Sequence, residues 1–211
     1  MWPWEHLAVG YILLSIYCHG RAGTPPTEWS VLTLAVATQL PDVIDKPLAW
    51  QFGILTGTSI AHSILVSLLL IFIVGIVSGR IGRPAVSTAF AVGYLSHLLA
   101  DLAYPMIRGR GHFAWGAILW PGPERVVTEP STAAAGSGAS TVQTGAGFLS
   151  QVGHRFGDFV SFLGTPSGQA YLLLELILLG SAITLWVLDG KPGIHVITDY
   201  LHLGRLGSYL E

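Results

Sequence analysis

The chain has 211 residues, of which 51% are hydrophobic and only 10% are charged. A soluble domain usually carries about 25% charged residues, so this chain has too little charge to cover a soluble protein's surface. The formal net charge is −2, and no basic stripe exists to neutralise phosphates, which excludes a nucleic-acid binder. Cys18 is the single cysteine, which excludes an internal disulfide and a cysteine-based zinc site. The composition is that of an integral membrane protein.

Five apolar segments approach or reach the roughly 20 residues that span a bilayer. In chain order they are Leu7–Tyr17, Trp29–Leu40, Ile64–Val77, Ala85–Ile107 and Ala170–Leu188. We therefore expect an all-α fold, a multi-pass transmembrane helical bundle of about four core helices plus a C-terminal fifth. The shorter apolar piece His112–Trp120 is typical of a re-entrant or interfacial segment.

These segments divide the chain into three parts. Residues 1–121 are expected to form a membrane-embedded helical domain, and residues 169–211 the fifth transmembrane helix with an interfacial tail. Residues 122–168 contain a long run of Ser, Gly, Ala and Thr, which cannot bury a core. We expect this middle part to be a flexible loop.

Six side chains that can bind metals lie at or near the ends of the predicted helices. They are His6, Asp42, Asp45, His62, His97 and Asp101. Successive helices cross a membrane in opposite directions, so the start of the first and third and the end of the second and fourth share one side. Ionisable groups at membrane depth are costly unless they are paired or ligated. The sequence therefore predicts that the six converge at one end of the bundle.

The residue types at this end suit a divalent metal ion. His97 and Asp101 are four residues apart on one helix face, and histidine with carboxylate favours zinc ahead of manganese. We assign the metal ligands to His6, Asp42, His62, His97 and Asp101. His6 and Asp45 complete a second ion or orient the first. Such an ion activates water for hydrolysis of an ester or phosphoester, with Asp42 or Asp45 as general base.

Simpler interpretations stay open for each of these groups. His97 and Asp101 can form a plain hydrogen bond, and the two aspartates of the second helix can be a helix cap and a turn. Arg108, Arg110 and His112 follow on the same side and can contact a phosphate of the substrate. The two arginines can equally be anchors that face lipid headgroups.

The ordered motifs of residues 1–121 resemble a known family. They are His6, Leu-Pro-Asp-Val-Ile-Asp at Leu40–Asp45, the pair His62–Ser63, the stretch Gly93–Leu102 and an apolar run that ends at Trp120–Pro121. The set is similar to the membrane-bound metal-dependent hydrolases, also described as LexA-binding, inner-membrane-associated hydrolases. The resemblance implies a multi-pass helical protein with hydrolase chemistry. Many members carry His-Arg-Gly where this chain has Gly57-Thr58-Ser59, so one ligand and one phosphate contact of the family are missing here.

The expected partners are membrane lipid and a small ester or phosphoester substrate, with no nucleic acid. We expect a multi-pass protein of the cell membrane, and the arginines of the two short loops opposite the site favour an extracytoplasmic site. The alternative function is a non-catalytic integral membrane protein with a structural metal site or a protein-binding face. A transporter or ion relay ranks last, because it needs a polar path to the opposite side and only Glu175 offers one.

Overall fold

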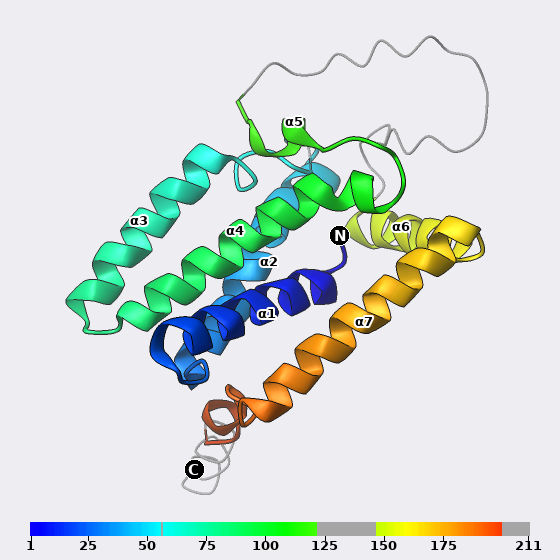
Figure 1. Cartoon of the computed structure of the whole chain (residues 1–211). Coiled ribbons are helices and arrows are strands. Elements are labelled where there is room, and N and C mark those ends of the chain that lie inside the picture. Colours follow the sequence, from blue (N-terminus) through cyan, green and yellow to red (C-terminus); the bar gives the residue numbers. More distant parts are fainter. Residues whose placement is uncertain (56, 122–146, 200–211) are drawn as a thin grey trace, which may run out of the picture.

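The structure is a computed structural model, which describes residues 1–55, 57–121 and 147–199. Within these ranges it contains α-helices and no strand, so the expected all-α fold is confirmed there. The helices are α1 (Pro3–Ala22), α2 (Glu28–Trp50), α3 (Ile64–Arg80), α4 (Pro84–Ile107), α5 (Trp115–Ile118), α6 (Phe148–Leu163) and α7 (Pro166–Leu188). The long helices lie side by side, and the N-terminus and α6 lie at the same end of them (Figure 1).

The second helix is longer than its apolar segment predicted. It runs to Trp50, so Asp42 and Asp45 lie inside it and not beyond its end. Pro41 and Pro47 also lie inside α2, although each removes a backbone hydrogen bond. In the described chain, α2 makes its most extensive helix pairing with α4.

Close packing fixes the distance between α2 and α4. Leu34, Ala37 and Tyr94 are fully buried between them. Gly93 is part of this contact, because a Cβ built there would lie 3.0 Å from Ala37 Cβ and 3.1 Å from the Leu34 carbonyl oxygen. The close packing therefore fixes the relative position of α2, which carries Asp42 and Asp45, and α4, which carries His97 and Asp101.

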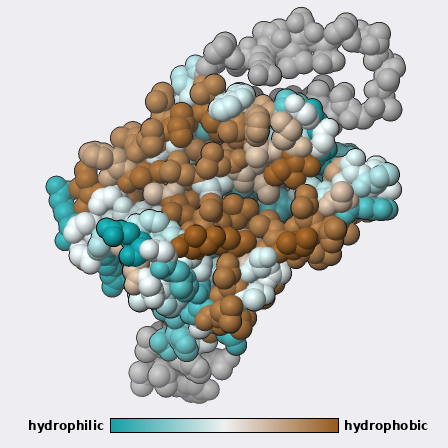
Figure 2. Space-filling view, in the orientation of Figure 1, coloured by the Kyte–Doolittle hydropathy of each residue, from teal (hydrophilic) through white to brown (hydrophobic). Residues whose placement is uncertain are grey.

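Two described helices, α4 and α7, are long and apolar enough to cross a membrane, and α3 is apolar but has 17 residues. Much of the surface of these helices is also apolar, as the broad hydrophobic area in Figure 2 shows. Exposed side chains include Leu69 and Phe72 on α3, and Leu173 and Leu176 on α7. Soluble monomers rarely expose apolar patches of this extent, so the surface fits a lipid environment.

Part of the segment expected to be a loop is helical. Within residues 122–168, α6 occupies Phe148–Leu163. Its exposed apolar side chains recur every three or four residues, as in an amphipathic helix. They are Leu149, Val152, Phe156 and Val160. Residues 122–146 lie outside the described residues, so the flexible loop stays a prediction there, as does the tail from 200 to 211.

Candidate metal centre

Four side chains from different parts of the chain form a buried cluster at the end of the helices that carries the N-terminus. Asp42 comes from α2, His62 from the segment before α3, and His97 and Asp101 from α4. One ligand atom from each residue can be chosen so that all four lie within 4.8 Å of one another. The side chains of both histidines are fully buried, and the carboxylates of Asp42 and Asp101 are 8% and 13% exposed.

The distances between these atoms match those between ligands of one ion. His62 Nε2 lies 3.2 Å from His97 Nε2, 3.4 Å from Asp101 Oδ2 and 3.6 Å from Asp42 Oδ1. His97 Nε2 lies 3.6 Å from Asp101 Oδ2 and 3.8 Å from Asp42 Oδ1. With metal–ligand bonds of about 2.0–2.2 Å, ligands at tetrahedral corners lie about 3.3–3.6 Å apart. The cluster can therefore hold a divalent metal ion, whose identity the geometry does not determine.

One carboxylate oxygen of Asp42 supplies an independent argument for a cation in the cluster. Its Oδ2 accepts a short hydrogen bond from Lys46, one helical turn later. Its Oδ1 is buried and has no hydrogen-bond partner among the described residues. An unpaired buried carboxylate oxygen is costly, and a metal ion among His62, His97 and Asp101 would remove that cost.

The outer nitrogens of the two histidines are held by hydrogen-bond acceptors. His97 Nδ1 lies 2.6 Å from the Thr38 carbonyl oxygen of α2, and His62 Nδ1 lies 2.8 Å from Asp45 Oδ2. Because Nδ1 donates to these oxygens, Nε2 of each ring faces the cluster, where it can bind a metal ion once it carries no proton. This is how metal-binding histidines are usually oriented in proteins.

Asp45 organises the segment that carries His62. Its carboxylate is fully buried and accepts backbone N–H groups from Ser59 at 2.7 Å, Ala61 at 3.1 Å and His62 at 3.1 Å. The Tyr94 hydroxyl of α4 donates to the Ala61 carbonyl oxygen at 2.6 Å. The role of Asp45 as general base stays a prediction. Its geometry instead favours orienting His62, since its acceptor positions are already used.

The charge of the cluster affects the protonation of His62. Burial disfavours the charged ring, but the surrounding carboxylates of Asp101, Asp42 and Asp45 outweigh burial and raise the pKa of His62 to about 10. The metal-free protein therefore carries a proton on this ring at neutral pH. A metal ion and that proton would compete for the same nitrogen.

His6 lies next to the four-residue cluster, on the first turn of α1. Its fully buried ring stacks on His97, with 3.8 Å between the ring centroids and 19° between the planes. His6 Nε2 lies 3.3 Å from Asp101 Oδ1. The ammonium group of Met1 donates to the same oxygen at 2.7 Å. All residues predicted as metal ligands thus lie at one end of the bundle, and their binding of metal stays a prediction.

The residues predicted to contact substrate make their observed contacts with groups other than the four cluster residues. The Arg108 guanidinium lies over the Phe162 ring, 3.8 Å from its centroid, and donates to the Tyr104 hydroxyl at 3.3 Å. Arg110 and His112 are exposed, and His112 Nδ1 lies 3.1 Å from the Arg110 carbonyl oxygen. Their role in substrate binding stays a prediction, and packing against α6 is the main contact seen for Arg108.

Two buried carboxylates that the sequence did not connect join α1 to α7. The Tyr171 hydroxyl of α7 donates to Glu5, and the Trp4 indole N–H of α1 donates to Glu175. The sequence analysis assigned no partner to Glu175 and no role to Glu5. An apolar helix with one central Glu indicates a partner, but the partner itself lies 171 residues away and has no local signal.

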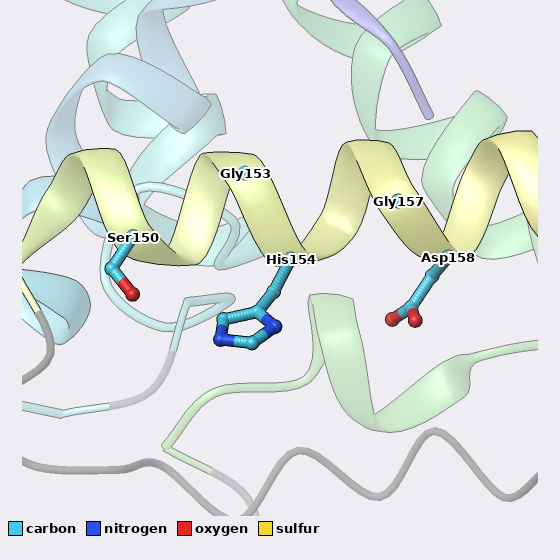
Figure 3. A pocket seen from close by; sticks show the side chains of 5 residues that line it. All are labelled: Ser150, Gly153, His154, Gly157 and Asp158. Atoms are coloured by element: carbon cyan, nitrogen blue, oxygen red, sulfur yellow. The ribbon is translucent and has the colours of Figure 1, made fainter.

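The polar face of α6 forms a shallow hollow on the surface. Ser150, His154 and Asp158 project toward the same side of the helix, and Gly153 and Gly157 complete its lining (Figure 3). The hollow has a volume of about 340 Å³. All five residues are exposed, so the hollow marks the polar side of an amphipathic helix and not a second buried site.

In the comparison with known proteins, a family model described as "YdjM inner membrane protein" matches residues 1–132. No curated protein and no solved structure matches the chain.

Proposed function

This chain belongs to the YdjM inner membrane protein family, and from that premise we propose that it is a multi-pass membrane hydrolase that depends on a divalent metal. The family and the two apolar helices support the membrane location. The observation that carries the proposal is the buried group Asp42, His62, His97 and Asp101, in which Asp42 Oδ1 has no hydrogen-bond partner among the described residues. The LexA-binding description belongs to the resemblance and is not part of this proposal.

Each residue of the cluster has a task that its contacts support. When bound, the ion would act as a Lewis acid, which acidifies water and neutralises charge on an ester or phosphoester oxygen. Asp45 and the Thr38 carbonyl fix the two histidine rings. Asp42 keeps one oxygen paired with Lys46 and has the other free to bind the ion or to accept a proton.

The position of α6 supports a substrate that comes from the membrane. Phe159 of α6 packs edge-on against Trp2, at 5.2 Å between the ring centroids, beside the turn that carries His6. Arg155 lies over the Trp50 ring at the end of α2. A helix with one apolar and one polar face lies in the plane of a membrane interface. This arrangement supports a position of the cluster near the level of lipid headgroups, where ester and phosphoester bonds lie.

The proposal is tested by hydrolysis assays on the full chain in mixed micelles of detergent with carboxylester or phosphoester lipids. We expect turnover that a chelator removes and that zinc or manganese restores. His97→Gln should lower turnover by at least about 100-fold, because it removes a ligand whose partners are fixed. Asp189→Asn is the matched control, because Asp189 is a buried carboxylate that binds Tyr11 and Ser15 outside the cluster. Turnover that survives in His97→Gln contradicts the proposal.

A structural metal site is the second candidate, and the burial of the cluster favours it. Both histidines are fully buried, and a closed site with four protein ligands usually stabilises a fold. The two candidates differ in whether a further ligand can reach the ion. In the Co²⁺-loaded protein, added phosphate should change the visible absorption spectrum of an open site and leave that of a closed site unchanged.

A further inference from the structure

Asp101 presents its two carboxylate oxygens to two different groups of side chains. Oδ2 lies 3.4 Å from His62 Nε2 and 3.6 Å from His97 Nε2, within the four-residue cluster. Oδ1 lies 3.3 Å from His6 Nε2, outside that cluster. A carboxylate with this placement can bind one ion through each oxygen, as bridging carboxylates do in two-metal sites.

His6 lacks the partners that a buried histidine requires. The residue is fully buried, and neither ring nitrogen has a hydrogen-bond partner among the described residues. Leaving such a group unpaired is costly, because burial removes the water that would otherwise bind both nitrogens. Its Nε2 approaches Asp101 Oδ1 without forming a hydrogen bond, at a distance close to those between the ligand atoms of the cluster. A cation between these two atoms would satisfy both.

The surroundings of Asp101 Oδ1 already favour positive charge. The Met1 ammonium group lies 2.7 Å from this oxygen, and the side chains of both residues are largely buried. An ion bound between Asp101 and His6 would displace that ammonium group. Since His6 and Asp101 offer it only two ligand atoms, such an ion would be held more weakly than one in the four-residue cluster.

We propose that this protein binds a second divalent cation through His6 Nε2 and Asp101 Oδ1, so that Asp101 bridges two ions. The inference rests on the proposed function, because the four-residue cluster holds the neighbouring ion. A nitrogen and a carboxylate oxygen suit zinc or manganese at this position. With only these two protein ligands, the second ion would leave room for an ester or phosphoester oxygen of the substrate. In this proposal His6 binds the second ion, which contacts the substrate, and does not bind the ion of the four-residue cluster.

The test is a metal titration of the chelator-treated full chain in detergent, with Mn²⁺ as the probe. We expect the wild-type chain to bind two ions in a tight and a weak step, and His6→Gln to keep only the tight step. His19→Gln is the matched control, since His19 lies on the same helix but is half-exposed and pairs with Asp189; it should bind two ions. Electron paramagnetic resonance should show a coupled Mn²⁺ pair in wild type and an isolated ion in His6→Gln.

The outcomes separate this inference from the proposed function. Binding of a single ion by the wild-type chain at saturating Mn²⁺, lost in His97→Gln, overturns the second site and leaves the first intact. A weak step and a coupled signal that persist in His6→Gln also overturn it. Absence of any bound ion in wild type removes the proposed function as well. The wild-type measurement decides the case even where a variant does not fold.

Discussion

Replacing Asp45 by asparagine should weaken metal binding although Asp45 does not reach the ion. The carboxylate takes three hydrogen bonds on Oδ2, from Ser59 N–H, His62 N–H and His62 Nδ1, and one on Oδ1, from Ala61 N–H. In the Asp45→Asn variant, the amide can keep its oxygen on the three-bond side. It then turns its NH₂ group toward the Ala61 N–H, which loses its acceptor.

The size of the effect follows from these contacts. Losing one buried hydrogen bond to a charged group costs about 1.5–3 kcal/mol of folding free energy. Loss of the carboxylate that orients a metal-binding histidine usually lowers metal affinity about 10–100-fold, or about 1.4–2.7 kcal/mol. Affinity is measured by competition with a coloured chelator at fixed pH, and stability by thermal unfolding in the same detergent.

The control separates loss of the fold from loss of the site. Asp189→Asn also removes a buried carboxylate, one that accepts hydrogen bonds from Tyr11 at 2.7 Å and Ser15 at 2.8 Å. It should lower stability by a similar amount and leave metal affinity unchanged. Wild-type affinity in Asp45→Asn, or an equal loss of affinity in Asp189→Asn, refutes the proposed role of Asp45.

Three further predictions concern the same end of the bundle. Because His62 has a pKa of about 10 in the metal-free protein, the ion bound by the four-residue cluster displaces a proton, so its affinity should rise about tenfold per pH unit from about pH 6 to 8. A flat pH profile in chelator competition contradicts this. Gly93→Ala should lower the free energy of unfolding by about 1–3 kcal/mol, because the new Cβ would lie only 3.0 Å from Ala37 Cβ. Unchanged stability in thermal unfolding would mean that α2 and α4 pack less tightly than the structure shows. Tyr94→Phe should lower the free energy of unfolding by about 1 kcal/mol and the metal affinity several-fold, because the Ala61 carbonyl oxygen loses its hydrogen-bond donor. Thermal unfolding tests the first effect and chelator competition the second, each against wild type.

The apolar pattern predicted the long helices because lipid-spanning length and hydropathy are local properties. Ile64–Val77 lies within α3, and Ala85–Ile107 lies within α4. The extension of α2 through Pro41 and Pro47 had no such signal, since proline normally ends a helix and here tertiary packing overrides it. The helix α6 was not predicted, because it contains two glycines and follows a segment rich in Ser and Gly, so its apolar periodicity was not recognised.

The gathering of the polar residues was predictable for a different reason. It depends on the order of the helix ends along the chain and on the alternating direction of successive helices, which brings His62 and His97 to the same end of the bundle. The role of Asp45 in orienting His62 depends on how residues 59–62 fold back onto α2. Hydrogen bonds from backbone N–H groups cannot be predicted from residue types, because every residue except proline has such a group. Sequence reasoning therefore found the cluster but not the contacts that orient its histidines.

The measurement to make first is the metal content of the full chain, purified in detergent without chelators and analysed by mass spectrometry. The His97→Gln/Asp101→Asn double variant and Asp189→Asn are purified alongside it. We predict stoichiometric zinc or manganese in wild type and in Asp189→Asn, and its loss from the double variant. A wild-type chain without stoichiometric metal, or equal metal in the double variant, would show that the buried group is a hydrogen-bonded polar cluster and not a metal centre.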